Sequence, residues 1–239
     1  MKNNLNNKID EILILCGGLG TRLKNFSNDL PKSMVKVDNK VFLDCLVDKI
    51  RREYNKTITL LLSHKSEYFI DYFKNKKDIK FHINKELLGT GGSVKSYLNQ
   101  NKKTSNIILI NGDSYFDFNL NYCVDFHYQK RSNFTVVTAV SSDDKFDKGI
   151  LQSDNNCMML SFGEKVIKNN RYSSSGIYIF EKNIFFEIKK NKFSIEFDLL
   201  PKIIKKYSCF EYKTDNIYFD IGTPERFSIF KNFYLKNKK

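Results

Sequence analysis

Long hydrophobic runs are absent from this sequence of 239 residues. No apolar stretch approaches the roughly 20 residues that a helix needs to cross a bilayer. The first residues, MKNNLNNKIDE, are polar where a secretory signal requires an apolar stretch. The sequence therefore predicts neither a membrane-spanning helix nor a membrane partner, and we expect the protein to remain in the cytoplasm.

Cysteine and histidine are also scarce. The five cysteines are scattered without CxxC spacing, and the three histidines supply no ligand cluster beside them. Zinc sites and disulfide frameworks both depend on such groupings. The sequence therefore predicts neither.

The chain has an excess of positive charge, with 40 Lys and Arg against 27 Asp and Glu and a formal net charge of +13. Such a charge can serve a nucleic-acid partner, because cations that meet phosphates release counterions. The lysines are instead spread from end to end, which indicates a solvated basic surface. We expect no nucleic-acid partner, although the positive field helps to attract nucleotides and sugar phosphates.

The first half of the chain alternates between buried strands and amphipathic helices. Apolar runs at 12–15, 57–63, 79–83 and 106–114 are separated by helical patterns at 42–54, 67–73 and 93–100. This rhythm predicts an α/β fold with a Rossmann-like, mainly parallel sheet, helices on both faces and ligand sites at the carboxyl ends of the strands.

The second half of the chain has a different pattern of apolar residues. Beyond residue 133, short strand-like runs with turn residues between them predict extra strands that make the sheet mixed. Residues 193–207 predict a helix interrupted at Pro201, and two last strands are expected at 209–214 and 217–222. No internal repeat or long linker separates the halves. One domain over residues 1–239 is therefore expected.

A glycine-rich turn, Gly17-Gly18-Leu19-Gly20-Thr21-Arg22-Leu23, follows the first expected strand, and Pro31-Lys32 comes soon after it. Glycine lets a backbone approach a phosphate or base closely. The turn is neither a P-loop, which ends in Gly-Lys-Ser/Thr, nor a dinucleotide fingerprint, which needs a small residue where Leu23 stands. Arg22 and Lys32 suit a triphosphate and its departing pyrophosphate. The alternative is an ordinary surface turn.

Two acids stand at the ends of apolar strands, Asp113 in ILINGDS and Asp220 in YFDIGTPE. Carboxylates at neighbouring strand ends can bind Mg²⁺, which prefers a few carboxylates together with waters and phosphate oxygens. Turn formation is the other common use of such an Asp.

A third group is Glu164-Lys165 in LSFGEKV, with Gly149 before it and Gly176 after it. A strand-end lysine could hold a sugar phosphate as a point charge, and the glycines leave room for a sugar ring. An exposed charge pair is the alternative.

In this order, the motifs resemble those of the sugar nucleotidyltransferases, also called nucleoside-diphosphate-sugar pyrophosphorylases. Their signature has a GGxGTRL loop with a following Pro-Lys, an LGTGG-type turn, a GD dipeptide, an EK dipeptide and a closing D-x-G-T-P. These motifs fall here at Gly17–Leu23, Pro31-Lys32, Leu88–Gly92, Gly112-Asp113, Glu164-Lys165 and Asp220–Pro224. Six elements in one order are far more specific than any one of them.

The resemblance implies a GT-A-like version of the fold and a role for each candidate residue. A nucleotide-binding half over about 10–130 and a sugar-phosphate-binding half over about 131–230 are expected. The implied nucleotide-binding residues are Leu15, Gly17, Gly18, Gly20, Thr21, Glu86, Gly89 and Gly91. The implied sugar-phosphate-binding residues are Gly149, Glu164, Lys165, Ser175 and Gly176. The implied catalytic residues are Arg22, Lys32, Asp113, Lys165 and Asp220, with Asp113 and Asp220 as the Mg²⁺ ligands.

The reaction implied is transfer of a nucleoside monophosphate from an NTP to a sugar 1-phosphate, with release of pyrophosphate. No protein nucleophile is needed, because a sugar-phosphate oxygen attacks the α-phosphorus in line. The CGGLGTRL start, the FGEKV segment and a short ending without a C-terminal β-helix are most similar to bacterial D-glycero-α-D-manno-heptose 1-phosphate guanylyltransferases. GTP, the heptose 1-phosphate and a role in surface polysaccharide synthesis are therefore expected, and a homodimer is the default assembly.

Several alternatives stay open. Many relatives have an Asn-Ala-Gly-like segment where this chain has Ser174-Ser175-Gly176, and a proline where it has Val166. The first departure falls in the expected sugar pocket, so mannose 1-phosphate or another base is the rival specificity. A non-catalytic regulatory relative is disfavoured because all five catalytic candidates are present. A glycosyltransferase is disfavoured because no Asp-x-Asp motif surrounds Asp113.

Overall fold

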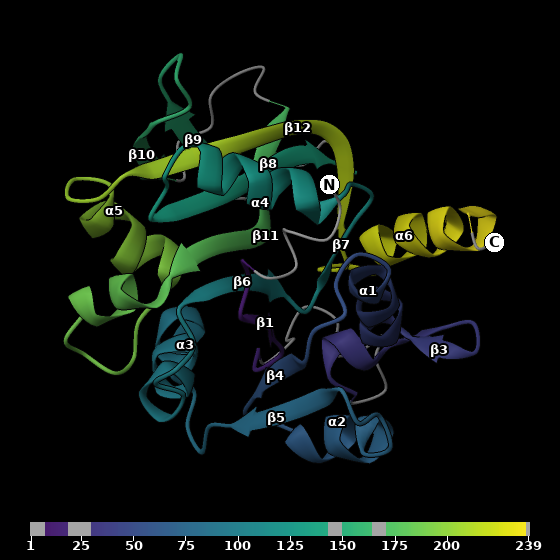
Figure 1. Cartoon of the computed structure of the whole chain (residues 1–239). Coiled ribbons are helices and arrows are strands. Elements are labelled where there is room, and N and C mark those ends of the chain that lie inside the picture. Colours follow the sequence, from purple (N-terminus) through teal and green to yellow (C-terminus); the bar gives the residue numbers. More distant parts are fainter. Residues whose placement is uncertain (1–7, 19–29, 143–149, 164–170, 238–239) are drawn as a thin grey trace.

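One mixed sheet of eight strands forms the centre of the protein (Figure 1). The computed structural model describes residues 8–18, 30–142, 150–163 and 171–237. The strands lie in the order β5-β4-β1-β6-β11-β8-β12-β7. In chain order, they are β1 (Glu11–Leu15), β4 (Ile58–Leu62), β5 (Ile79–Ile83), β6 (Asn106–Asn111), β7 (Ser114–Phe116), β8 (Phe134–Ser141), β11 (Tyr172–Glu181) and β12 (Cys209–Asp220).

The strand directions confirm the mainly parallel arrangement. Strands β5, β4, β1 and β6 run parallel to one another, and β12 runs parallel to β8. Strand β11 is antiparallel to both of its neighbours, and β7 is antiparallel to β12. Two small hairpins accompany this sheet: β2 (Lys36–Val37) with β3 (Lys40–Val41), and β9 (Ile150–Ser153) with β10 (Met159–Gly163).

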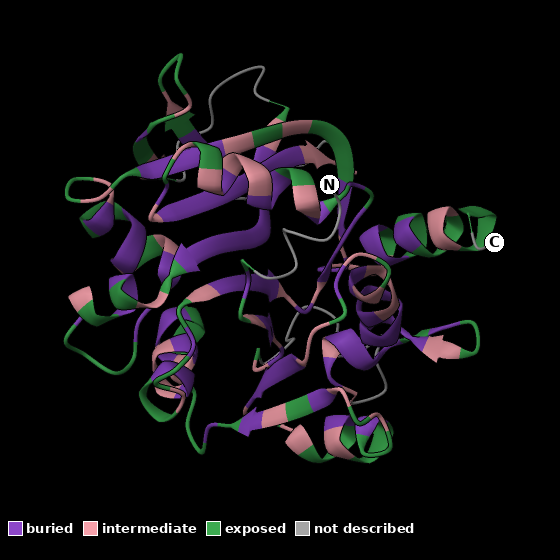
Figure 2. Cartoon of the chain, viewed as in Figure 1, coloured by how far each residue is buried: buried purple, intermediate pink, exposed green. Residues whose placement is uncertain are grey.

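Helices cover both faces of the sheet, as expected for strands that are apolar on both sides (Figure 2). One core contains Ile12 and Ile14 of β1 and is covered by α1 (Phe42–Arg51), α2 (Ser66–Phe73), α4 (Leu120–Gln129) and α6 (Pro224–Asn237). The other core contains Leu13 and is covered by α3 (Gly89–Gln100), α5 (Leu200–Ile203), the 3-10 helix η3 (Lys182–Glu187) and the π-helix η4 (Ile195–Leu199). Successive residues of β1 therefore enter opposite cores.

Two expectations about the second half were wrong. The two strands expected at 209–214 and 217–222 form one strand, β12, with a register shift between Thr214 and Ile217. Pro201 does not interrupt a helix. It lies in the first turn of α5, directly after η4, where a missing N–H costs nothing.

No helix in the described ranges is both long and apolar enough to span a membrane.

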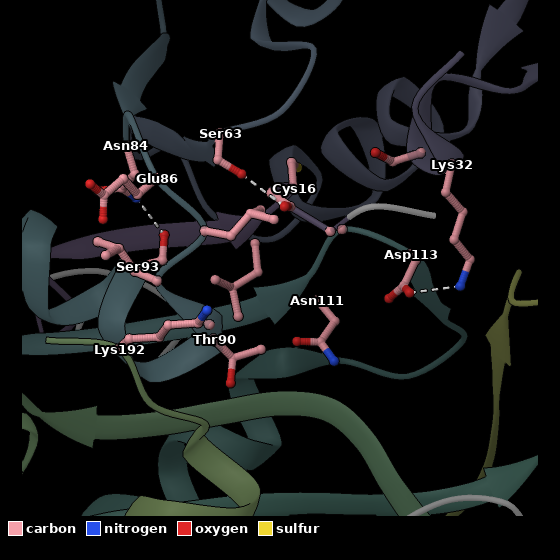
Figure 3. A pocket seen from close by; sticks show the side chains of 18 of the residues that line it. Cys16, Lys32, Ser63, Asn84, Glu86, Thr90, Ser93, Asn111, Asp113 and Lys192 are labelled. Atoms are coloured by element: carbon pink, nitrogen blue, oxygen red, sulfur yellow. Dashed lines mark hydrogen bonds and ion pairs between the residues drawn. The ribbon is translucent and has the colours of Figure 1, made fainter. Parts of the chain in front are cut away.

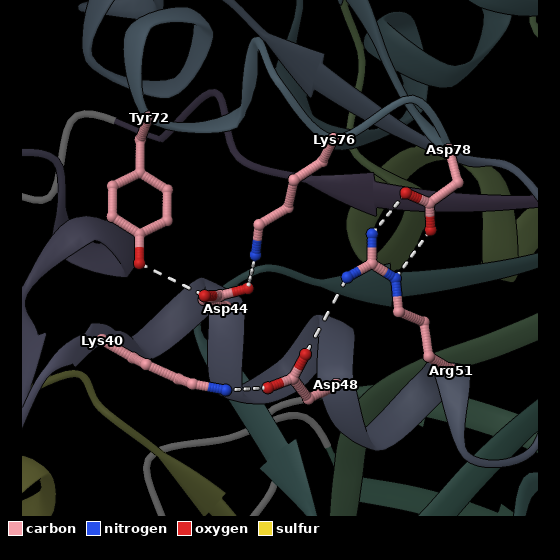
Figure 4. Close-up of polar contacts among 7 residues, drawn as sticks. All are labelled: Lys40, Asp44, Asp48, Arg51, Tyr72, Lys76 and Asp78. Carbon is pink, nitrogen blue, oxygen red and sulfur yellow. Dashed lines mark hydrogen bonds and ion pairs between the residues drawn. The ribbon is translucent and has the colours of Figure 1, made fainter.

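A group of ion pairs joins α1 to α2 and to the chain that enters β5 (Figure 4). The buried Asp44 carboxylate, in the first turn of α1, accepts hydrogen bonds from Lys76 Nζ and, at 3.2 Å, from the Tyr72 hydroxyl. At the other end of α1, Arg51 donates to both carboxylate oxygens of Asp78. These bonds hold α1 against α2 and the start of β5.

Asp44→Ala is expected to lower the free energy of unfolding by about 3 kcal/mol, because it leaves the Lys76 ammonium without its buried partner. The Asp44 side chain is only 6% exposed. Asp71→Ala is the matched control, since the Asp71–Lys74 pair is 80% and 58% exposed and should contribute less than about 1 kcal/mol. Urea denaturation measures both, and equal losses would contradict the assigned role of burial.

Candidate functional site

A cavity of about 560 Å³ opens at the carboxyl ends of the parallel strands (Figure 3). Its size suits a small-molecule ligand. The residues that line it follow β1, β4, β5 and β6, and one end of α3 completes the wall. The cavity therefore lies at the edge of the sheet where the sequence predicts ligand sites.

Five of the expected nucleotide-binding residues line this cavity, namely Leu15, Gly17, Gly18, Glu86 and Gly89. Gly17 is held by Ser63, whose hydroxyl donates to the Gly17 carbonyl at 2.8 Å. A side chain at Gly17 would bring its Cβ within 2.7 Å of Ser63 Oγ. The glycine therefore allows the turn to pack against the end of β4.

The LGTGG segment is the start of helix α3, and its glycines have different tasks. Gly89 has a φ of +73°, in the region that favours glycine, and faces the cavity. Gly91 is not among the residues that line the cavity. Its N–H donates to the carbonyl oxygen of Phe193 at 3.0 Å, and a Cβ there would lie 2.2 Å from the Phe193 ring. In this structure Gly91 therefore admits Phe193 rather than a ligand.

Lys32 and Asp113 form an ion pair at the end of the cavity away from Asn84 and Glu86, with Nζ 2.8 Å from Oδ2 (Figure 3). Lys32 begins the 3-10 helix η2 (Lys32–Met34), and Asp113 follows β6. Their side chains are 18% and 35% exposed, so the charges are partly shielded from water while ligands can still reach them. Residues 81 positions apart thus meet where the sequence placed a triphosphate and a metal.

The second acid, Asp220, lies beside Asp113. Its strand β12 pairs with β7, so that Asp220 is opposite Ser114, and the N–H of Ile221 donates to the Asp113 carbonyl at 3.0 Å. Asp220 Oδ1 accepts a hydrogen bond from the Gly222 N–H at 2.7 Å and lies 3.4 Å from Arg226 Nη1. The sheet therefore brings together two strand-end acids that are distant in sequence.

This donor set fits Mg²⁺. Two carboxylates at neighbouring strand ends leave coordination positions for waters and phosphate oxygens, as this ion prefers. A cluster of three or more His, Cys, Asp or Glu side chains, which would suit a metal held by protein alone, does not occur among the described residues.

Cys16 also lines the cavity, but its thiol is unsuited to nucleophilic attack. Burial raises the pKa of the Cys16 thiol far above its ordinary value, and the negative charge of Asp113 raises that pKa further. The reactive form of cysteine is the thiolate. Cys16 therefore stays protonated, consistent with a reaction that needs no covalent intermediate.

On the expected sugar side, Gly176 has a φ of +75° and packs tightly against Asn111, which lines the cavity. A Cβ at Gly176 would lie 2.6 Å from Asn111 Nδ2. The Ser175 side chain is buried, and its hydroxyl donates to the Val137 carbonyl at 2.8 Å. Six expected site residues lie outside the described ranges: Gly20, Thr21, Arg22, Gly149, Glu164 and Lys165.

The structure adds cavity residues that sequence reasoning missed. Ser63 follows β4 and Asn84 follows β5, so the strand-end rule could have found both. Asn84 Nδ2 donates to Ser93 Oγ of α3 at 2.8 Å, which joins two walls of the cavity. Lys192 also lines the cavity but belongs to the second half of the chain, and no motif or strand end in the sequence marks it as a site residue.

Comparison with known proteins gives consistent matches. The family model for nucleotidyl transferases matches residues 11–237. The D-glycero-alpha-D-manno-heptose 1-phosphate guanylyltransferase of Campylobacter jejuni is 34% identical over 220 residues, which cover 90% of this chain and 96% of that protein. The protein of the same name from Aneurinibacillus thermoaerophilus is 30% identical, with coverages of 90% and 94%.

Solved structures agree with these relatives. The crystal structure of HddC from Yersinia pseudotuberculosis matches with a TM-score of 0.82 and 32% identity, covering 95% of this chain and all of that one. The same protein complexed with GMP-PN gives a TM-score of 0.80 over 94% of this chain. Because the family model spans both halves of the sheet and both acids of the site, this chain belongs to the nucleotidyl transferase family.

Proposed function

We propose that this enzyme transfers GMP from GTP to D-glycero-α-D-manno-heptose 1-phosphate, giving GDP-heptose and pyrophosphate for surface polysaccharide synthesis. The observation that supports the proposal is the Lys32–Asp113 pair beside Asp220, at one end of a cavity that is also lined by the glycine turn. Two relatives that share at least 30% identity over most of their length carry the name of this activity.

The cavity suggests how the substrates would lie. The turn at Gly17 and Gly18, together with Gly89 and Glu86, would hold the base and ribose, and the triphosphate would extend toward Lys32. Asp113 and Asp220 would hold Mg²⁺, which neutralises phosphate charge when bound. Arg22 would assist Lys32, and Lys165 would bind the sugar phosphate, as the family resemblance implies. Residues of about 131–230 would supply most of the sugar side.

The reaction then depends on positioning of the two substrates and on positive charge near the phosphates, and it needs no reactive side chain. An oxygen of the sugar phosphate, already anionic, forms a bond to the α-phosphorus while the bond from that phosphorus to the β-phosphate oxygen breaks. The electron pair of the broken bond leaves on pyrophosphate. The Lys32 ammonium, released from Asp113 by the incoming triphosphate, would stabilise the charge that develops on this leaving group.

The test is pyrophosphate release by the purified protein with Mg²⁺, in which GTP, CTP, UTP, dTTP and ATP are each combined with heptose, mannose and glucose 1-phosphates. We expect release with GTP and the heptose 1-phosphate together, and none when either is left out. Release with GTP and mannose 1-phosphate alone would replace the proposed sugar. A folded protein that is silent with every pair would overturn the proposed activity.

A further inference from the structure

Helix α6 carries a buried positive charge in its first turn, and the reaction described above gives that charge no role. The residue is Arg226, whose side chain is only 6% exposed. Cations are disfavoured at the first turn of a helix, where the backbone dipole is positive, and a buried guanidinium is costly unless an anion lies beside it. Arg226 therefore needs an explanation that the helix itself does not supply.

The anion beside Arg226 is Asp220, one of the two acids proposed to hold Mg²⁺. Arg226 Nη1 lies 3.4 Å from Asp220 Oδ1, and the same oxygen accepts a hydrogen bond from the Gly222 N–H at 2.7 Å. The backbone N–H of Arg226 donates to the Thr223 hydroxyl at 3.3 Å. The short turn between β12 and α6 therefore keeps the guanidinium and the carboxylate together.

A second cation reaches the same turn from the first half of the chain. A Cβ at Gly222 would lie 3.4 Å from Lys32 Nζ and 3.5 Å from Arg226 Nη1. Both cations therefore flank Gly222, which lines the cavity. Lys32 Nζ in turn lies 2.8 Å from Asp113 Oδ2 (Figure 3). Two carboxylates, those of Asp113 and Asp220, thus lie beside two cations, and the four charges balance.

The two cations are held differently. The Lys32 side chain is 18% exposed and ends a flexible stem, so an incoming triphosphate can draw its ammonium away from the carboxylate. The Arg226 side chain is less exposed, and its helix is fixed in the core through Phe230, which is fully buried. We therefore expect Arg226 to remain beside Asp220 when the substrates bind.

This balance of charge has a consequence for metal binding. Two carboxylates attract a divalent cation less strongly when positive charges lie a few ångströms away. A metal ion that arrives with a triphosphate brings negative charge of its own and meets no such barrier. We propose that Arg226 is a positioning residue that holds the Asp220 carboxylate and balances its charge, so that Mg²⁺ binds together with the nucleotide and not alone. The proposal rests on the metal site that belongs to the function proposed above.

Arg226→Met tests the proposal in protein without nucleotide, with Mn²⁺ alone as the probe. The variant leaves a carboxylate without its cation, so the affinity for Mn²⁺ should rise about 10-fold, as expected when a unit charge a few ångströms from a divalent ion is removed. Electron paramagnetic resonance of the unbound ion gives this affinity. A purely structural role predicts the opposite sign or no change, because a displaced Asp220 is a poorer ligand.

The same variant should respond in the opposite sense to the nucleotide. With one positive charge fewer, the site repels the triphosphate, so the affinity for GTP with Mg²⁺ should fall about 10-fold in isothermal titration. Arg226→Lys keeps the charge and should stay within about threefold of the wild type in both measurements. Arg226→Gln keeps a hydrogen-bond donor without the charge and should repeat both shifts, which covers the case that methionine prevents folding.

Arg51→Met is the matched control. Arg51 also pairs with an acid, Asp78, but neither residue lines the cavity. Its loss should lower the free energy of unfolding and leave the affinities for Mn²⁺ and GTP unchanged. A double variant isolates the partner of Arg226: in an Asp220→Asn protein, Arg226→Met should no longer raise the affinity for Mn²⁺, because the carboxylate that it balances is gone.

The outcomes distinguish this proposal from the function on which it rests. An Mn²⁺ affinity that falls or stays the same in Arg226→Met and Arg226→Gln would overturn the role of Arg226, whatever the activity of the wild type. An equal rise in Arg51→Met would overturn it as well. If the expected shifts occur but the wild type releases no pyrophosphate with any sugar 1-phosphate, the proposed activity is wrong and the charge balance around Asp220 is confirmed.

Discussion

Asp113→Asn is expected to lower kcat for pyrophosphate release about 10³-fold while leaving the protein folded. The change removes one of the two carboxylates proposed to hold Mg²⁺ and also removes the partner of Lys32. Groups that act on developing charge in a partly shielded site contribute effects of this size. The melting temperature should change little, because the pair is 18% and 35% exposed and contributes modestly to stability.

Asp117→Asn provides the matched control. Asp117 is exposed and directly follows β7, four residues after Asp113. Its substitution removes the same charge as Asp113→Asn. Its kcat should stay within about twofold of the wild type, as for other surface substitutions. The measurement is a steady-state assay at saturating GTP and heptose 1-phosphate, with circular dichroism to verify the fold. If both variants kept the full rate, the assignment of Asp113 would be wrong.

Lys32→Met should lower kcat/KM by about 10²- to 10³-fold in both directions of the reaction. In the forward direction the ammonium would balance charge on departing pyrophosphate, and in reverse it would bind the attacking pyrophosphate. Methionine keeps much of the side-chain volume and removes the charge. Because the lost ammonium is proposed to contact pyrophosphate and not the sugar, KM for pyrophosphate in the reverse reaction should rise more than KM for the nucleotide sugar.

The control for Lys32 is Lys36→Met, which removes the same charge from an exposed lysine in β2. This variant should keep its rate and show only the small change in salt dependence that follows from a lower net charge. Isothermal titration with GTP gives an independent readout. Equal GTP affinity in the wild type and Lys32→Met, together with an unchanged rate, would remove Lys32 from the triphosphate site.

The central sheet and the edge at which the cavity opens could both be predicted from the sequence, because both depend on local patterns. A short apolar run such as ILIL indicates a strand that is buried on both faces of a sheet, and β1 is such a strand. Asp113 and Asp220 were found because a strand end followed by a small residue is a local signal as well. That the two acids lie close together was predicted from their positions at strand ends. The pairing of β12 with β7 explains it, because it places Asp220 opposite Ser114, the residue after Asp113.

The predictions that failed depended on contacts between distant segments. Two strands were predicted where β12 is one. The register shift between Thr214 and Ile217 that lets β12 continue has no signal in the local sequence. The LGTGG segment was predicted to bind the nucleotide through Gly89 and Gly91, and that role stays a prediction. The fold packs both glycines against Phe193, which no local pattern indicates, and of the two only Gly89 lines the cavity. Lys192 was missed as a cavity residue because the other residues that line the cavity come from distant parts of the chain.

The contact between Phe193 and the start of α3 has a consequence for how the enzyme is made. The Phe193 carbonyl accepts hydrogen bonds from the N–H groups of Gly91 and Gly92 and so closes a loop of about a hundred residues. Contacts between such distant segments form late, because the entropy of loop closure must be overcome first. A nascent chain that has emerged from the ribosome as far as β7 already carries the glycine turn, Lys32, the LGTGG segment and Asp113, but Gly91 and Gly92 do not yet have Phe193 as their partner. We therefore expect tight nucleotide binding only after the second half of the chain has been made and has folded.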